Sequence, residues 1–191
     1  MRAKVEASKK RALSSRTAKR GLVIVNTGDG KGKTTAALGA ALRAVGHGKK
    51  VLILQFLKGA LKSGELKSAK LLSPFLSIRT LGSTLIDFPK GPTQKHREEA
   101  SRALEIARKE ISSGAYDLIV LDEINNAVDY GLIQAEDVLK LIREKPARLH
   151  LILTGRSANK KIIAAADTVT DMREVKHPFQ REIKARKGIE Y

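Results

Sequence analysis

The sequence of 191 residues predicts an α/β fold in which a mostly parallel sheet lies between two layers of helices. Two observations predict it. Short runs that are apolar throughout alternate with stretches of helical periodicity, as expected of strands buried on both faces. The first run also leads through a glycine-rich turn into a helix-favouring stretch, which is the order of a phosphate-binding P-loop. The length suits one domain with a substantial core.

The P-loop candidate is the segment 22–35, which reads LVIVNTGDGKGKTT. Three glycines within 28–32 can take positive φ, so that backbone N–H groups close around phosphate oxygens, and the following helix adds its positive end. Lys33 adds a full charge, and Thr34 is placed to bind a magnesium ion through its hydroxyl. The usual pattern has glycine where this chain has Thr27. A turn that only caps a helix is the alternative.

The other elements follow from the same patterns. Apolar runs predict strands at 22–25, 51–55, 77–80, 118–121 and 149–153. Helical periodicity predicts helices at 34–45, 65–72, 93–113 and 135–144. Two prolines and two glycines between Gly82 and Thr93 predict an irregular loop, and a loop of this length in a compact domain is usually functional or disordered.

The fourth apolar run ends in Asp122 and Glu123, which is the Walker B arrangement. We expect this strand beside the P-loop strand, where it would deliver a carboxylate to the metal on the phosphates. In a hydrolase one carboxylate would orient a water molecule, whereas in transfer to another nucleophile both can serve Mg²⁺. Arg156 follows the next strand, so it can reach a nucleotide or a second substrate, or it is a surface arginine.

Charge is the strongest compositional signal, because the formal net charge is +17. Residues 1–20 hold eight Lys or Arg and one Glu, so we expect a basic arm at 1–20 before a domain at 21–191. Such a field attracts polyanions, although a solubilising arm or an organellar transit peptide is an alternative. No apolar run approaches the ~18 residues of a membrane span. The absence of cysteine excludes disulfides, and with no secretory signal we expect a cytoplasmic protein.

Several motifs together resemble a known family. They are NTGDGKGKTTAALGAALRAVGHGKKVLILQFLKG, LIVLDEINNAV, LILTGR, AADTVTDMREVKHPF and the terminal KGIEY. From about residue 20 to 191 the chain resembles the ATP:corrinoid adenosyltransferases of the cobalamin pathway. The resemblance implies a RecA-like P-loop fold, usually homodimeric, that transfers the 5′-deoxyadenosyl group of ATP to a Co(I) corrinoid and releases triphosphate. It also implies a nucleotide bound in reverse, with C5′ facing the cobalt.

The resemblance assigns roles to individual residues. Lys33 neutralises the triphosphate, Thr34 and Glu123 hold Mg²⁺ with Asp122 close by, and the basic arm orders over the corrinoid. Lys33 and Glu123 are thus the implied catalytic residues, and the electron donor is a reduced flavin or flavodoxin. The residues implied to contact the nucleotide are Thr27, Gly28, Asp29, Gly30, Lys31, Gly32, Lys33, Thr34, Thr35, Arg43, which would reach the ribose, and Arg156.

The chain departs from the family in one loop. Well-studied members carry a Phe and, two residues later, a Trp after the third strand, where the pair displaces the lower cobalt ligand. Here that loop reads GSTLIDFPKGP and Phe88 is its only aromatic residue. We expect Phe88 either to exclude the lower ligand or to anchor the loop to the core.

Two other function classes compete with the transferase. One is a P-loop ATPase acting on nucleic acid, which the net charge favours, and the other is a nucleotide-binding module without chemistry. Aromatic residues make up only 4% of the chain, which is few for base stacking, so we do not expect a nucleic-acid partner.

Overall fold

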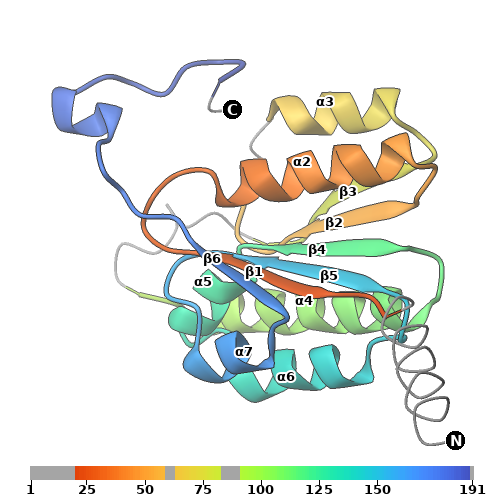
Figure 1. The fold of residues 1–191 in the computed structure, drawn as a ribbon. Coiled ribbons are helices and arrows are strands. Elements are labelled where there is room, and N and C mark those ends of the chain that lie inside the picture. The colour runs from red at the N-terminus through yellow and green to blue at the C-terminus, as the bar shows by residue number, and fades with distance from the viewer. Residues whose placement is uncertain (1–19, 59–62, 83–90, 190–191) are drawn as a thin grey trace, which may run out of the picture.

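The computed structural model describes residues 20–58, 63–82 and 91–189. Six strands form one parallel sheet in the order β3-β2-β4-β5-β1-β6. Helices α2 and α3 cover one face, and α4, α5, α6 and α7 cover the other (Figure 1). This arrangement confirms the predicted three-layer α/β class. Among the described residues, none of the helices combines the length and the apolar character needed to cross a membrane.

The elements follow one another along the chain with short connections. They are β1 (Val23–Thr27), α2 (Lys33–Gly46), β2 (Val51–Gln55), α3 (Gly64–Leu71), β3 (Leu76–Thr80), α4 (Gln94–Ser112), β4 (Leu118–Asp122), α5 (Ile124–Asp129), α6 (Ala135–Glu144), β5 (His150–Thr154), α7 (Lys160–Ala165), β6 (Thr168–Asp171) and the 3₁₀ helix η2 (Pro178–Arg181). The predicted strands and helices all occur within two residues of their expected bounds. The short elements α5, α7 and β6 were not predicted.

The central strands are buried on both faces, which explains their uninterrupted apolar sequences. Every residue of β2 and β4 is buried. Alternate side chains feed two cores, so Leu52 and Leu54 pack toward α4 and α6 while Val51 and Ile53 pack toward α2. Full burial of each such side chain stabilises the fold by roughly 1.5–3 kcal/mol.

The strand order corrects one expectation from the sequence. β1 pairs with β5 and β6, and β4 pairs with β2 and β5, so β5 separates the acidic strand from the P-loop strand. The prediction that the acidic strand lies directly beside the P-loop strand was therefore wrong. Because all six strands run in parallel, their carboxyl ends still meet at one edge of the sheet, where ligands bind in such folds.

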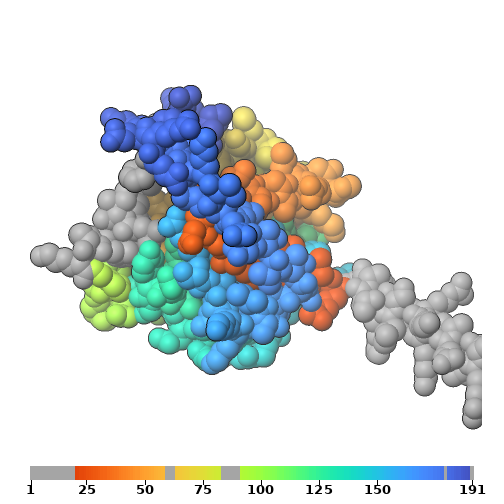
Figure 2. All heavy atoms as spheres, turned by 60° about the vertical axis from the view of Figure 1, so that its left-hand side comes forward, coloured from red at the N-terminus to blue at the C-terminus, as the bar shows by residue number. Residues whose placement is uncertain are grey.

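Strand β6 brings the C-terminal part of the chain to this same edge. All four of its residues are exposed, and it pairs with β1 alone among the described strands. The short, polar sequence TVTD gave no strand signal. In Figure 2 the blue segment after β6 runs over the orange-red residues of β1 and the P-loop.

Candidate functional site

The P-loop joins β1 to α2 in the expected conformation. Gly28 has φ 94° and Gly32 has φ 112°, values that side chains rarely adopt. Gly32 is also the N-cap of α2 and no side chain caps the helix. The first N–H groups of α2 lack acceptors within the helix and face the loop, where a bound anion can accept from them.

Lys33 lies inside the loop and is 8% exposed. Its ammonium donates to the carbonyl oxygens of Gly28 and Gly30, both at 2.6 Å. Burial is the main cause that lowers the pKa of Lys33, and the nearby charge of Arg156 lowers it further. The charge is thus poorly solvated, which strengthens its attraction to a phosphate group.

The main chain of residues 172–173, directly after β6, packs against the P-loop and forms a wall behind it. The Gly30 N–H donates to the carbonyl of Met172 at 2.7 Å, and the Met172 N–H donates to the carbonyl of Thr27 at 2.8 Å. A Cβ at Gly30 would lie 2.7 Å from backbone atoms of Arg173, and one at Gly28 would overlap Asp171. Close contact therefore requires glycine at both positions, and at Gly28 the positive φ requires it as well. Nothing in the sequence pattern indicated this contact.

Thr27 does not line the pocket that the loop forms. Its hydroxyl accepts a hydrogen bond from the Ala158 N–H at 3.1 Å, and the residue is 8% exposed. Thr27 thus ties β1 to the segment after β5. The contact of Thr27 with the nucleotide stays a prediction.

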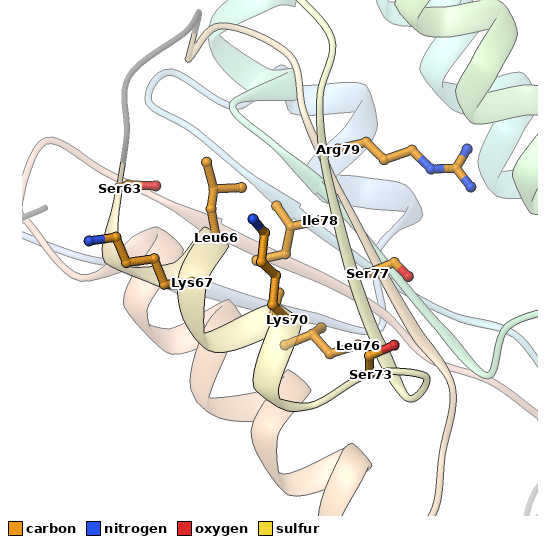
Figure 3. Close-up of a pocket in the computed structure, with 10 residues that line it drawn as sticks. Ser63, Leu66, Lys67, Lys70, Ser73, Leu76, Ser77, Ile78 and Arg79 are labelled. Atoms are coloured by element: carbon orange, nitrogen blue, oxygen red, sulfur yellow. The ribbon is translucent and has the colours of Figure 1, made fainter.

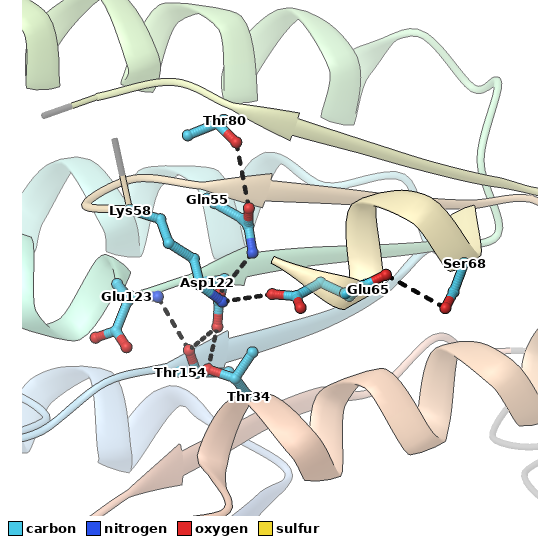
Figure 4. A network of polar contacts seen from close by, with 10 residues as sticks. Thr34, Gln55, Lys58, Glu65, Ser68, Thr80, Asp122, Glu123 and Thr154 are labelled. Atoms are coloured by element: carbon cyan, nitrogen blue, oxygen red, sulfur yellow. Dashed lines mark hydrogen bonds and ion pairs between the residues drawn. The ribbon is translucent and has the colours of Figure 1, made fainter. Parts of the chain in front are cut away.

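Asp122 is the centre of a polar network at the edge of the sheet (Figure 4). Its carboxylate is fully buried, and Oδ1 accepts from the hydroxyls of Thr34 at 2.8 Å and Thr154 at 2.7 Å. Thr154 in turn accepts from the Glu123 N–H at 2.9 Å. The structure therefore brings Thr34, Asp122 and Glu123 together, although Asp122 lies behind the pocket and does not line it.

Glu123 is held in a left-handed conformation with φ 65° at the N-cap of α5. Such a conformation costs a non-glycine residue about 1 kcal/mol or more and is frequent at functional sites. Burial raises the pKa of Glu123, and the adjacent Asp122 raises it further, against the opposing charges of Lys33, Lys58 and Arg156. A cation placed beside this pair would relieve the repulsion between the two carboxylates.

These groups surround a cavity of about 360 Å³ at the carboxyl edge of the sheet. Asn126 and Tyr130, both on or next to α5, were not predicted, and they lie one and two helical turns beyond the acidic pair. Asn126 accepts the Arg156 N–H on Oδ1 at 2.5 Å and so positions the turn that carries Arg156. The lining residues are Asp29, Gly30, Lys31, Gly32, Lys33, Thr34, Thr35, Glu123, Asn126, Tyr130 and Arg156.

Arg43 is not part of this cavity. It lies in the last turn of α2, ten residues after Lys33 and hence roughly 15 Å away along the helix axis. There it lines a cavity of about 890 Å³ near the amino ends of β1 and β5, together with Lys49 and His150. The structure therefore does not bring Arg43 together with the residues of the P-loop cavity, and its contact with the ribose stays a prediction.

Another cavity, of about 620 Å³, lies between α3 and β3 and is shown in Figure 3. Lys67 and Lys70 reach into it from α3, but no carboxylate lines it. Phe88 and residues 1–19 of the basic arm lie outside the described residues, so the predictions about them stay predictions. Arg20, the last residue of the arm, forms an ion pair with Asp167 at 3.3 Å.

The oxygen atoms at the acidic pair suit a magnesium ion. Within the described ranges, no three or more His, Asp or Glu side chains form a group that could hold a metal by themselves. Mg²⁺ in nucleotide enzymes is usually held by one or two carboxylates together with phosphate oxygens and waters. The Thr34 hydroxyl and the carboxylates of Asp122 and Glu123 match that donor set.

Comparison with known proteins decides the family. Residues 19–191 match the family ATP:corrinoid adenosyltransferase BtuR/CobO/CobP. The chain belongs to this family. A corrinoid adenosyltransferase from Sinorhizobium is 37% identical over 193 residues, covering 99% of this chain and 89% of the relative. Another, from Escherichia coli K12, is 39% identical over 178 residues, covering 90% of this chain and 86% of the relative.

A solved structure supports the fold alone. The flagellar accessory protein FlaH from Methanocaldococcus jannaschii matches with a TM-score of 0.53 and 15% identity, covering 79% of this chain and 70% of FlaH. Together with the sheet order, this likeness confirms the predicted RecA-like P-loop architecture.

We predict that Gly30→Ala lowers the affinity of this family member for ATP by about tenfold or more, because the added Cβ pushes the loop away from residues 172–173 and misplaces at least one N–H donor. Equilibrium titration with ATP measures the loss. Gly39→Ala is the matched control, since its Cβ meets no atom within 4 Å on the exposed face of α2. Equal affinities for both variants and the wild type would contradict the close-contact argument.

We also predict that Glu123→Gln raises the melting temperature of the nucleotide-free protein in EDTA at neutral pH, because the raised pKa means that the fold disfavours the ionised carboxylate. The gain in melting temperature should shrink as the pH falls toward 4.5, the ordinary pKa of a glutamate, because the wild-type carboxyl is then itself protonated. Thermal scans across this pH range test the sign. The exposed Glu98→Gln should give no such gain, and a gain independent of pH would argue against the electrostatic cause.

Proposed function

We propose that this chain transfers the 5′-deoxyadenosyl group of ATP to the Co(I) of a reduced corrinoid and releases triphosphate. The observation that carries the proposal is that the family match spans the P-loop and the acidic pair, whose Lys33, Thr34 and Glu123 line one cavity. A P-loop alone occurs in many nucleotide-binding proteins with different activities. The family membership is therefore what indicates the reaction.

The reaction is a displacement at the ribose C5′ atom. The electron pair of Co(I) forms the Co–C5′ bond as the C5′–O5′ bond breaks, and the bonding pair leaves on the triphosphate oxygen. The cobalt is formally oxidised to Co(III), and no proton is transferred. The protein therefore has one main task in this step, which is to stabilise the charge that grows on the leaving triphosphate.

The residues of the loop are arranged for this task. Lys33 and the N–H groups at the start of α2 would bind triphosphate oxygens, and Arg156, which lines the same cavity, would add a second charge. Mg²⁺, when bound at Thr34, Asp122 and Glu123, would supply further charge neutralisation. The burial that lowers the pKa of Lys33 also reduces solvent screening, so each interaction is stronger than it would be in water.

The second substrate would lie outside the carboxyl ends of the strands, next to the P-loop. We propose that the nucleotide binds in reverse, with its triphosphate in the loop and its ribose toward the corrinoid. We further propose a cytoplasmic homodimer in which the arm at 1–20 acts with the domain at 21–191. A reduced flavin or an acidic flavodoxin would supply the electron that produces Co(I).

The identity of the phosphate product tests the proposed function. We expect full-length protein, incubated with ATP, Mg²⁺ and a chemically reduced corrinoid, to release triphosphate in equal amount to the adenosylated corrinoid. Release of ADP without adenosylation would mean that the chain is an ATPase and would overturn the proposal. Tight ATP binding with no product of either kind would indicate a nucleotide-binding module without chemistry.

We predict that Lys33→Ala lowers kcat by roughly 10² or more in this assay, as well as weakening ATP binding, because the ammonium stabilises departing triphosphate more strongly than bound ATP. Single-turnover rates at saturating ATP measure the effect. Lys31→Ala, a neighbouring lysine of the same cavity, serves for comparison and should lose less. If saturating ATP restores the turnover of Lys33→Ala, Lys33 acts in binding alone.

The electron donor leads to a prediction about salt. Since the net charge is +17, docking of an acidic flavodoxin should weaken with ionic strength, and flavodoxin-supported turnover should fall with added salt. Turnover with a small chemical reductant should change little over the same range. The same salt dependence with both donors would exclude electrostatic docking as the cause.

A further inference from the structure

An ion pair lies directly behind the acidic pair, on the side away from the P-loop (Figure 4). Lys58 follows β2, and Glu65 is in the first turn of α3. The Lys58 ammonium is 2.7 Å from Oε1 of Glu65 and 3.8 Å from Oδ2 of Asp122. Neither residue lines the nucleotide cavity, so the pair can act on the reaction only through the nearby acidic pair, Asp122 and Glu123.

The two oxygens of Asp122 have very different surroundings. Oδ1 accepts short hydrogen bonds from Thr34 and Thr154, whereas Oδ2 has the Gln55 amide at 3.5 Å and the Lys58 ammonium at 3.8 Å. The Lys58 contact is an attraction between charges and is too long for a hydrogen bond. The Lys58 ammonium therefore already lies near Asp122, the carboxylate that would help to hold Mg²⁺.

Glu65 is the nearer of the two carboxylates that contact the Lys58 ammonium. Its contact with Lys58 is more than 1 Å shorter than the contact of Lys58 with Asp122. Burial alone would raise the pKa of Glu65, but the hydrogen bond and the charge of Lys58 lower it on balance. The side chains of Lys58 and Glu65 are 26% and 15% exposed, so solvent screens the pair only in part.

We propose that Lys58 and Glu65 are a positioning pair that sets the affinity of the acidic residues for their divalent ion: Lys58 competes with the ion for Asp122, and Glu65 holds Lys58 back. The inference rests on the proposed metal-binding role of Thr34, Asp122 and Glu123. It adds two residues that never touch the nucleotide, and it gives them opposite effects on one measurable constant.

The opposite effects follow from charge and distance. Without the Lys58 ammonium, the carboxylates of Asp122, Glu123 and Glu65 lose a neighbouring cation, so a divalent ion should bind more tightly. Without the Glu65 carboxylate, Lys58 is free to close the 3.8 Å gap to Asp122, so the ion should bind more weakly. Damage to the fold would instead weaken binding in both variants.

The pair would also affect turnover through product release. A divalent ion held at Thr34, Asp122 and Glu123 would also attract the triphosphate product, and product release often limits kcat in enzymes. A site that holds the ion too strongly would retain the product. Lys58 thus keeps the ion affinity within a range that allows release, and its removal should lower kcat while binding improves.

Mn²⁺ binding tests the inference, because free and bound Mn²⁺ are distinguished by electron paramagnetic resonance without turnover. With full-length protein in excess over ATP, so that little Mn²⁺ is bound by free ATP, we expect Lys58→Met to raise Mn²⁺ affinity by roughly threefold to tenfold and Glu65→Gln to lower it by a similar factor. Lys70→Met is the matched control, since Lys70 is an exposed lysine of α3, the helix that carries Glu65, and it lines the separate cavity between α3 and β3. It should change the affinity by less than about twofold.

Two further results separate the inference from the function on which it rests. Asp122→Asn should weaken Mn²⁺ binding strongly; if it does not, the proposed metal site is wrong. If Asp122→Asn weakens binding but the Lys58 and Glu65 variants both leave it unchanged, or both weaken it, the positioning pair is overturned while the metal site stands. Should Lys58→Met fail to fold, Lys58→Gln carries the same expectation, and an unchanged or weaker affinity in it would also overturn the pair.

Discussion

The structure depends on one fully buried group, the carboxylate of Asp122. A charged group without exposure to water is stable in a protein only if other groups replace its hydration. Here the hydroxyls of Thr34 and Thr154 do so, and they come from the start of α2 and the end of β5. The same two hydrogen bonds therefore fix β4, β5 and α2 relative to one another. The P-loop helix cannot shift along the sheet without breaking the solvation of this carboxylate.

Much of the fold could be read from the sequence because it rests on local patterns. The apolar runs of β2 and β4 reflect burial on both faces, and Gly32, Lys33 and Thr34 reflect the chemistry of phosphate binding. Thr34, Asp122, Glu123 and Arg156 could be placed at one site from a single rule. This rule is that the carboxyl ends of parallel strands share an edge.

The features that the sequence did not predict depend mostly on contacts between distant parts of the chain. The insertion of β5 between β1 and β4 depends on strand order, which no local pattern specifies. The ribose contact of Arg43, by contrast, rests on the resemblance alone and stays a prediction, while helix geometry places the residue far along α2 from Lys33. The wall at Met172 offers the loop its main-chain carbonyl, and a backbone group leaves no mark in the side-chain pattern. The role of Asn126 also needed the structure, since its partner is the backbone of Arg156.

The wall behind the P-loop links nucleotide binding to the order in which the chain is made. The loop at 28–33 is synthesised early, but the carbonyl of Met172 that holds the Gly30 N–H belongs to a segment about 140 residues later, next to the last strand of the sheet. A ribosome makes about 5–20 residues per second, so several seconds separate the two events. During that interval the glycine loop has no support from the residues after β6. The loop conformation of the finished protein is therefore complete only after almost the whole chain has emerged.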